Sequence, residues 1–157
     1  MTTTDNRVIV RDASLSDATF IADGNIAMAL ETENKVLDPN LTRPGVRALL
    51  EDPLKGRYFI ADSAGEAAGQ LMLTTEWSDW RNGDFWWIQS VYVLPAFRRH
   101  GVFRALFNHV EHAARNAPGV CGIRLYVERD NARARQTYLD LGAEMTDYDL
   151  MEWRLAK

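Results

Sequence analysis

The chain has 157 residues, of which a single one, Cys121, is a cysteine, and it contains no long run of apolar residues. One cysteine excludes a disulfide framework within the chain, and this is typical of a reducing compartment. Without an uninterrupted apolar run of about 20 residues, no membrane-spanning helix is expected. The first six residues form a short polar tail that does not resemble a signal peptide. These absences predict a cytoplasmic protein that has no membrane partner.

Positive charge is also in short supply. Lys and Arg number 18 against 22 Asp and Glu, which leaves a formal net charge of −4. This balance argues against a nucleic-acid partner and fits a small cationic substrate better. No histidine, cysteine and carboxylate spacing indicates a zinc site, so no metal is expected. The Gly-x-Gly-x-x-Gly fingerprint of dinucleotide-binding proteins is absent as well.

What is present is an ordinary globular composition, with 46% hydrophobic and 25% charged residues. A chain of this length can bury a full core in one domain. No internal repeat, low-complexity tract or linker divides it. The sequence therefore predicts a single domain over residues 1–157, and it leaves the oligomeric state open, a homodimer included.

The stretch that organises the chain begins with the apolar run Phe85–Leu94. Its aromatic and β-branched residues predict a strand buried on both faces, which Pro95 ends. A basic loop containing Gly101 follows, and a helical apolar pattern begins directly after it. This order points backbone N–H groups and a helix N-terminus at one spot, which suits a pyrophosphate. The loop residues are Arg98, Arg99, His100, Gly101, Val102, Phe103 and Arg104.

A second helical segment follows the next predicted strand, Gly122–Val127. Asn131, Ala134 and Tyr138 are spaced by three and four residues, so they lie on one face of a helix that Gly142 closes. Taken alone, they indicate a helix-capping asparagine and a half-buried core tyrosine.

Together the two segments resemble the GNAT superfamily of acyl-CoA-dependent N-acetyltransferases. The family's pyrophosphate loop reads Arg/Gln-x-x-Gly-x-Gly/Ala after a Val-x-Val-x-Pro-like strand. Val91–Pro95 and Arg98–Gly101 fit this pattern, whereas Phe103 stands where Gly or Ala is usual. Relatives also carry an Asn and, seven residues later, a Tyr, as Asn131 and Tyr138 do here. The resemblance implies an α/β (α+β) fold: a mixed, mostly antiparallel sheet with helices on both faces and a central parallel strand pair that splays apart.

The expected elements follow the order β-α-α-β-β-β-α-β-α-β-β. The first helix begins at a capping box of Ser14 and Asp17, and Pro44 and Asp52-Pro53 bound a second, shorter helix. Asn82-Gly83 indicates a tight hairpin turn. Strands are expected at residues 7–11, 58–62, 67–77, 85–94 and 122–127, with a final pair or one bent strand over 145–155.

The resemblance further implies a co-substrate, acetyl-CoA, whose pyrophosphate binds the loop Arg98–Arg104. The backbone of Val91, Tyr92 and Val93 would hold the pantetheine arm and the thioester carbonyl, which makes the Val91 N–H a candidate oxyanion donor. The side chains implied at the CoA arm are those of Asn131, Ala134 and Tyr138.

The implied activity is direct acetyl transfer to a primary amine, with Tyr138 protonating the departing thiolate. A small cationic or polyamine-like acceptor fits the charge balance. An aminoglycoside, a lysine side chain or a protein N-terminus are further acceptors that the sequence leaves open. A non-catalytic acyl-CoA-binding or sensing domain is the alternative class, and the retained tyrosine favours the enzyme.

The general base cannot be taken from the family pattern. Many relatives carry a Glu four residues before the position of Val91, where this chain has Trp87. If Asn82-Gly83 is a two-residue turn, Glu76 faces Gln89 and shares a face with Trp87, Gln89 and Val91. Glu76 is therefore the candidate base, although a bulge would shift the register by one residue and turn it away.

The acceptor side carries further candidates. Trp87 and Gln89 are expected to line a slot that binds the acceptor amine. Glu31 and Glu33, after the first predicted helix, are expected to close this slot and attract a cationic acceptor. The alternative is that Glu31 and Glu33 are solvent-exposed residues that only keep a loop soluble. Core packing is expected for most of the tryptophans around the hairpin, and one or two could hold a cation. These are Trp77, Trp80, Trp86 and Trp87.

Overall fold

The computed structural model describes residues 7–156, so the predicted polar tail over residues 1–6 lies outside the described part of the chain. The chain divides into two compact units, one reaching Tyr126 and one beginning at Val127. The single domain over residues 1–157 stays a prediction. The elements of the first unit are β1 (Val8–Asp12), η1 (Leu15–Asp17), α1 (Ala18–Glu33), α2 (Pro39–Glu51), β2 (Arg57–Ser63), β3 (Glu66–Ser78), β4 (Gly83–Val93), η2 (Pro95–Phe97), α3 (Val102–Asn116) and β5 (Val120–Leu125).

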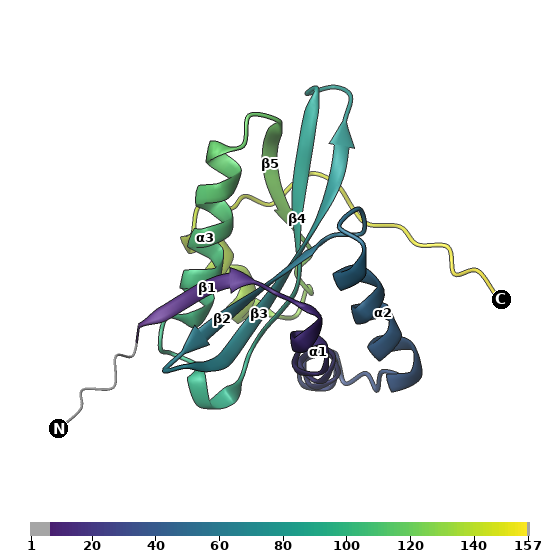
Figure 1. Ribbon diagram of the computed structural model, residues 1–157. Coiled ribbons are helices and arrows are strands. Elements are labelled where there is room, and N and C mark those ends of the chain that lie inside the picture. The colour runs from purple at the N-terminus through teal and green to yellow at the C-terminus, as the bar shows by residue number, and fades with distance from the viewer. Residues whose placement is uncertain (1–6, 157) are drawn as a thin grey trace. The chain divides into compact units, whose positions relative to one another are not determined.

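The first unit is built on a five-stranded sheet with the strand order β1-β2-β3-β4-β5 (Figure 1). The first four strands pair antiparallel, whereas β4 and β5 pair parallel. The parallel pair follows from the chain path, because α3 connects the two strands and returns the chain to the same end of the sheet. The predicted mixed, mostly antiparallel sheet is confirmed.

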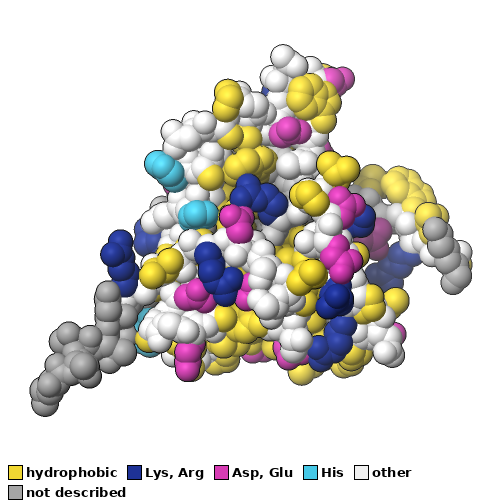
Figure 2. Space-filling view, viewed as in Figure 1, with side chains coloured by type: hydrophobic (Ala, Val, Ile, Leu, Met, Phe, Trp, Pro, Cys, Tyr) yellow, Lys and Arg dark blue, Asp and Glu magenta, His cyan; other side chains and the backbone are white. Residues whose placement is uncertain are grey.

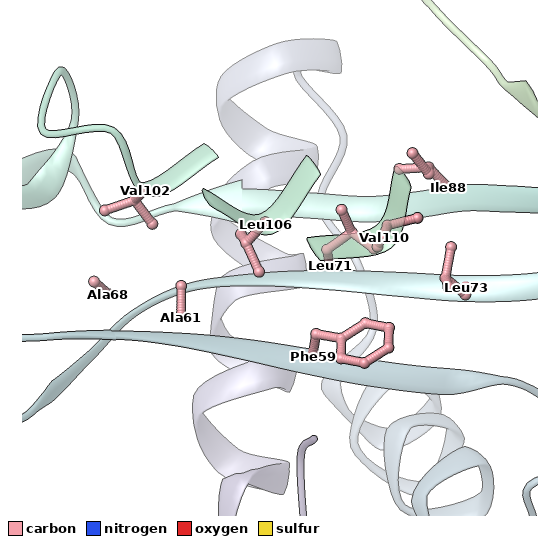
Figure 3. Packing of buried hydrophobic residues seen from close by; sticks show 9 residues of the cluster. All are labelled: Phe59, Ala61, Ala68, Leu71, Leu73, Ile88, Val102, Leu106 and Val110. Atoms are coloured by element: carbon pink, nitrogen blue, oxygen red, sulfur yellow. The ribbon is translucent and has the colours of Figure 1, made fainter. Parts of the chain in front are cut away.

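Helices cover both faces of this sheet, and each face has its own core. Alternate residues of β2 face opposite sides, so Phe59 joins the layer under α3 while Ile60 joins the layer under α1 and α2. Figure 3 shows the α3 layer, in which Leu106 is fully buried against the strands. This layer consists of Phe59, Ala61, Ala68, Leu71, Leu73, Ile88, Val102, Leu106 and Val110.

The second helix begins earlier than its proline pattern predicts. Asp38 is its N-cap and accepts a hydrogen bond from the Asn40 N–H at 2.9 Å, and Pro39 occupies the first turn. A proline at this position is favoured because its missing N–H would have no helical partner there. Pro44 lies inside α2. The prediction that Pro44, near the start of the helix, bounds it is therefore wrong.

The second unit contains one helix, α4 (Ala132–Asp140). No strand is found among the described residues after it, so the final strands predicted over residues 145–155 are wrong. A strand needs a neighbour for its backbone hydrogen bonds, and a unit with a single short helix supplies none. Several large apolar side chains of this segment are exposed, namely Met145, Tyr148, Leu150, Met151, Trp153 and Leu155.

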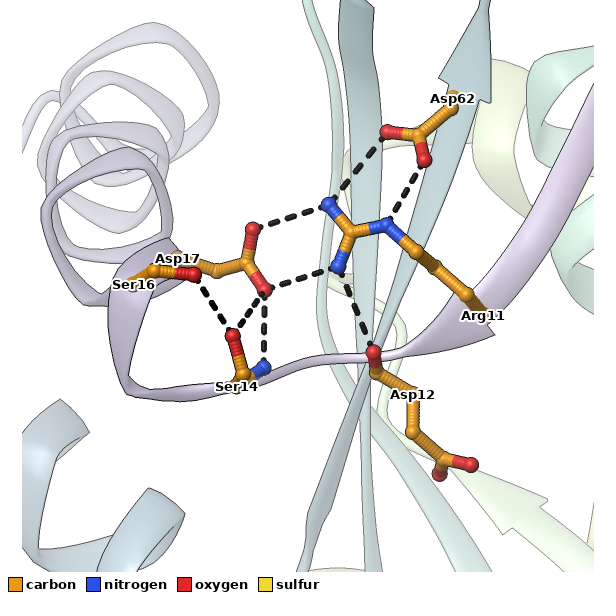
Figure 4. Close-up of polar contacts among 6 residues, drawn as sticks. All are labelled: Arg11, Asp12, Ser14, Ser16, Asp17 and Asp62. Carbon is orange, nitrogen blue, oxygen red and sulfur yellow. Dashed lines mark hydrogen bonds and ion pairs between the residues drawn. The ribbon is translucent and has the colours of Figure 1, made fainter.

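An arginine of β1 forms hydrogen bonds that connect the start of the first helix to the sheet (Figure 4). Arg11 donates to Asp62 of β2 at 2.7 Å and to both oxygens of Asp17 in η1, at 2.9 and 3.0 Å. The predicted capping box of Ser14 and Asp17 is confirmed, and the Ser14 N–H donates to Asp17 at 2.8 Å. The hydrogen bond from Arg11 holds the pKa of the Asp17 carboxyl below its usual range.

This depressed pKa generates a stability prediction. Asp17→Asn should lower the free energy of unfolding at pH 7 by about 1–3 kcal/mol, because it removes a buried, charged hydrogen-bond acceptor. The contribution of Asp17 is complete above its unfolded-state pKa of about 3.9 and is lost as the pH falls through the lower folded-state pKa. Urea unfolding from pH 7 down to pH 3 should therefore show the two proteins converging below about pH 4.

Asp23→Asn is the matched control, because Asp23 forms an exposed ion pair with Arg43. This control should cost about 0.5 kcal/mol or less. Equal losses in the two variants at pH 7, or an Asp17→Asn difference that persists unchanged at pH 3, would contradict the assignment.

Candidate active site

The site is organised by a β-bulge in β4. Ser90 has a φ of 50°, a left-handed conformation that residues other than glycine rarely adopt. Before the bulge, Met72 of β3 pairs with Gln89, and after it Gln70 pairs with Tyr92, so β4 holds one extra residue. A non-glycine residue in this conformation costs on the order of 1–3 kcal/mol, which the surrounding structure must offset.

Two hydrogen bonds show how the bulge turns the backbone. The Asp84 N–H donates to Gly119 O at 2.8 Å, on the β5 side of β4. The Leu94 N–H, ten residues later, donates to Ala68 O on β3 at 2.9 Å. Ten is an even number of residues, so a regular strand would point both groups to the same side. The extra residue at Ser90 reverses the alternation.

This reversal exposes backbone groups on the β5 side. After the bulge, the N–H and C=O groups of Val91 and Val93 point away from β3. The parallel ladder with β5 ends at the pair Ile88 and Leu125, so those groups have no strand partner within the ladder. The predicted splay of the central parallel pair is confirmed, and the Val91 N–H is a donor at the opening.

The bulge also reverses the side chains, which corrects one prediction. Gln89 lies on the α1 and α2 side and donates to Thr74 Oγ1 at 2.6 Å, whereas the Val91 side chain packs against the α3 layer. The prediction that Val91 shares a face with Trp87 and Gln89 is therefore wrong. Its cause is the single extra residue, which moves every later side chain to the other face.

The register of the hairpin differs from the prediction as well. Ser78 pairs with Gly83, so the turn contains four residues instead of the two predicted. Glu76 consequently faces Phe85 and not Gln89. It lies four positions, about 13 Å along the strand, further from the bulge than predicted. Its carboxylate also accepts a hydrogen bond from Arg124 at 2.8 Å.

Aromatic side chains continue from the site to the tip of the hairpin. Trp87 stacks on Tyr126 with their ring centroids 4.5 Å apart; no motif in the sequence points to Tyr126. Trp86 packs against the α3 core as predicted. Trp77 and Trp80 are 60% and 84% exposed, so these two are not packed in the core. Figure 2 shows hydrophobic side chains at this tip, at the top of the view.

The predicted pyrophosphate loop has the backbone of an anion site. Arg99 and Gly101 have φ values of 66° and 77°, and Gly101 is the N-cap of α3. The N-cap makes no side-chain hydrogen bond to this helix, and helix N-termini of this kind commonly bind anions. A Cβ built on Gly101 meets no atom within 4 Å. The glycine is therefore required by the backbone angle, while the space beside it is open.

The side chains of the loop fall into two groups. Arg99, His100 and Arg104 are exposed. Val102 is buried in the core under α3. The ring of Phe103, the residue that departs from the family pattern, lies 6.3 Å from that of Phe107 on the next turn.

Arg98 is exposed, but its side chain is held by several neighbours. It donates to Glu31 at 2.7 Å and to Val93 O at 3.0 Å, and it lies over the ring of Tyr92. The Tyr92 hydroxyl donates to the same Glu31 carboxylate at 2.7 Å. The hydrogen bonds from Tyr92 and then Arg98 hold the pKa of Glu31 below its usual range. Glu33 pairs with Lys35 at 2.9 Å, so neither predicted acceptor-side carboxylate is without a cation.

In the second unit, Asn131 caps α4 and its Oδ1 accepts a hydrogen bond from the Ala134 N–H at 3.1 Å. The interpretation of Asn131 as a helix cap is confirmed. Tyr138 lies two turns further along the chain and is half-buried. Burial raises the pKa of its hydroxyl above the ordinary value.

Within residues 7–156, no three His, Cys, Asp or Glu side chains gather as a metal site. No helix in this described part of the chain has the length and apolar character that crossing a membrane requires.

Comparison with known proteins identifies the family. The model of the acetyltransferase (GNAT) family matches residues 26–143, and no curated protein matches the chain. A structure titled as a possible acetyltransferase from Clostridium difficile 630 is 41% identical, with a TM-score of 0.91, over 96% of this chain and 99% of that chain. The chain therefore belongs to the GNAT acetyltransferase family, whose members use acetyl-CoA.

Two more distant structures share the fold. One is a predicted acetyltransferase with acetyl-CoA from Clostridium acetobutylicum, 16% identical, with a TM-score of 0.74, over 93% of this chain and 96% of that chain. The other is an aminoglycoside acetyltransferase from an uncultured soil metagenomic sample, in complex with sisomicin. It is 15% identical, with a TM-score of 0.72, over 98% of this chain and 99% of that chain.

Proposed function

We propose that this protein transfers an acetyl group from acetyl-CoA directly to a primary amine. The observation that carries the proposal is the bulge at Ser90, which turns the Val91 N–H toward the opening between β4 and β5. A backbone N–H fixed at that position can stabilise the oxyanion of a tetrahedral intermediate. Removing one such donor typically costs about 10²–10³ in kcat.

The cofactor's pyrophosphate is assigned to the loop and the first turn of α3. Donors there are the backbone N–H groups after Gly101, and Arg99 and Arg104 supply positive charge. Arg98 contributes less charge, because Glu31 already neutralises it. The pantetheine arm is assigned to the backbone of β4 beyond the bulge. Bound acetyl-CoA would supply the thioester, an acyl group activated toward an amine.

Tyr138 is proposed as the general acid. A tyrosine hydroxyl, whose ordinary pKa is about 10, is protonated at neutral pH, and burial raises this pKa further. It can therefore donate a proton to the CoA thiolate, whose thiol has an unperturbed pKa of about 8.5. Asn131 and Ala134 occupy the same helix segment and are proposed to contact the CoA arm.

The acceptor amine must lose a proton before attack, because an alkylamine has a pKa of about 10.4. Glu31, Glu33 and Glu76 each pair with a cation, namely Arg98, Lys35 and Arg124. We therefore assign proton removal to water. Glu76 is a weaker candidate for the general base than predicted. It pairs with Phe85 and not with Gln89, so it lies four positions further from the bulge than expected.

The acceptor is proposed to be a small cationic or polyamine-like amine. The face that carries Gln89 and the stacked pair of Trp87 and Tyr126 supports this choice, because aromatic faces bind cations. A cytoplasmic location is proposed with it, since the one cysteine, Cys121, is exposed and free.

The proposal can be tested by turnover with a mixed panel of amines, measured as release of free CoA. The panel should contain a polyamine, a lysine peptide, a free peptide N-terminus and an aminoglycoside. Gly101→Asp should lower kcat/KM at least about tenfold, because it places a carboxylate and a strained backbone at the pyrophosphate.

Gly45→Asp is the control, because it adds the same charge on α2 at a position with open space and no positive φ. It should leave turnover within about twofold of the parent, as surface changes usually do. Equal activity of parent and Gly101→Asp would refute the loop assignment. Calorimetric binding of acetyl-CoA without turnover of any amine would instead indicate a non-catalytic acyl-CoA-binding domain.

The proposed acid generates a separate prediction. Tyr138→Phe should lower kcat by about 10- to 100-fold, the low end for general-acid catalysis, because the thiolate can also leave unaided. Tyr148→Phe, at an exposed tyrosine of the same unit, should change nothing. An unchanged kcat in folded Tyr138→Phe, with chemistry shown to limit the rate, would remove Tyr138 from the mechanism.

A further inference from the structure

A buried polar cluster joins four elements of the first unit at the bulge. Its members are Asn25 of α1, Tyr58 of β2, Gln70 of β3 and Ser90 of β4. The first three are 8%, 4% and 0% exposed, so they are polar groups set inside the core. Buried polar groups are costly unless they are hydrogen-bonded, so a cluster of this kind needs an explanation.

The hydrogen bonds run from α1 to the bulge. Gln70 Nε2 donates to Asn25 Oδ1 at 2.8 Å and to Ile21 O at 3.2 Å. Asn25 Nδ2 in turn donates to the Tyr58 hydroxyl at 3.0 Å. Burial raises the pKa of the Tyr58 hydroxyl, and interactions with the side chains of Asn25 and Ser90 oppose that rise. Tyr58 is thus the link between α1 and the residue that forms the bulge.

Gln70 contacts the bulge from the neighbouring strand, β3. It pairs with Tyr92, the first residue of β4 that pairs with β3 after the bulge. Its side-chain amide lies against Gly24 of α1, where a Cβ would come within 2.5 Å of Gln70 Oε1. That oxygen has no hydrogen-bond partner among the described residues. The close approach of α1 therefore holds the amide in place.

Ser90 is a residue that needs to be held. Its positive φ is disfavoured for any side chain with a Cβ, whereas glycine would adopt it freely. Without the left-handed residue the strand would lose its bulge. The Val91 N–H would then point to β3, as its place in a regular ladder requires.

We propose that Tyr58, supported by Asn25 and Gln70, is a positioning residue that holds Ser90 in its left-handed conformation and thereby aims the Val91 N–H at the thioester carbonyl. This inference rests on the proposed acetyl transfer. It goes beyond it by assigning a role in that reaction to a core tyrosine that touches neither cofactor nor acceptor.

The test combines Tyr58→Phe with Ser90→Gly. Tyr58→Phe should lower kcat about tenfold, a fraction of the 10²–10³ expected for complete loss of an oxyanion donor, with a smaller change in KM for acetyl-CoA. Ser90→Gly should stay within about threefold of the parent, because glycine needs no support at this φ. The double variant should recover to within about threefold of Ser90→Gly, since nothing is then left for Tyr58 to hold.

Val110→Ala serves as the control for stability. This substitution leaves a cavity in the α3 layer, on the opposite face of the sheet. It should lower Tm but leave kcat unchanged at temperatures below the start of unfolding. A merely structural role of Tyr58 would give the same pattern as Val110→Ala. It would not be rescued by Ser90→Gly.

A second readout separates this inference from the proposed function. The Ser90 13Cα and 13Cβ chemical shifts report its backbone conformation, and Tyr58→Phe should move them away from left-handed values in the free protein. Parent turnover with an unaffected Tyr58→Phe kcat, a double variant no better than Tyr58→Phe, or unchanged Ser90 shifts would each overturn the inference. A parent that acetylates no amine would defeat the proposed function, and the Ser90 shifts would still decide the conformational claim.

Discussion

One extra residue in β4, at Ser90, is the constraint on which the site depends. It reverses the alternation of the strand, so that the backbone of Val91 and Val93 faces the gap where β5 has ended. The same reversal sends the Val91 side chain into the α3 layer and the Tyr92 side chain toward α1. A single bulge therefore determines the direction of the Val91 N–H at the opening between β4 and β5. It also determines the contacts of the Val91 and Tyr92 side chains.

The side chain of Tyr92 connects this bulge to the cofactor loop. Its hydroxyl donates to Glu31, which also accepts from Arg98, and Arg98 reaches back to Val93 O. The end of α1, the splayed strand and the start of the loop are therefore held by one carboxylate. Glu31 therefore already has a cationic partner, Arg98, before any acceptor binds.

The sequence predicted well whatever depends on a local pattern. The apolar run Phe85–Leu94, the glycine loop and the helix after it are local, and they lie where expected. The position of the bulge and the length of the four-residue turn were not predicted, because a strand's apolar pattern does not record an extra residue or a turn length. The pairs Glu31–Arg98 and Glu76–Arg124 join residues 67 and 48 positions apart, which no local spacing reveals.

The most direct measurement of the central claim is the 15N–1H signal of Val91 during titration with acetyl-CoA and, separately, with CoA. The two ligands share the pyrophosphate and the pantetheine arm, and only acetyl-CoA has the thioester carbonyl. The account predicts that acetyl-CoA shifts the Val91 amide proton downfield, as a new hydrogen bond does, and that CoA leaves this signal much less affected. Identical Val91 shifts with both ligands would contradict the assignment of this N–H to the carbonyl.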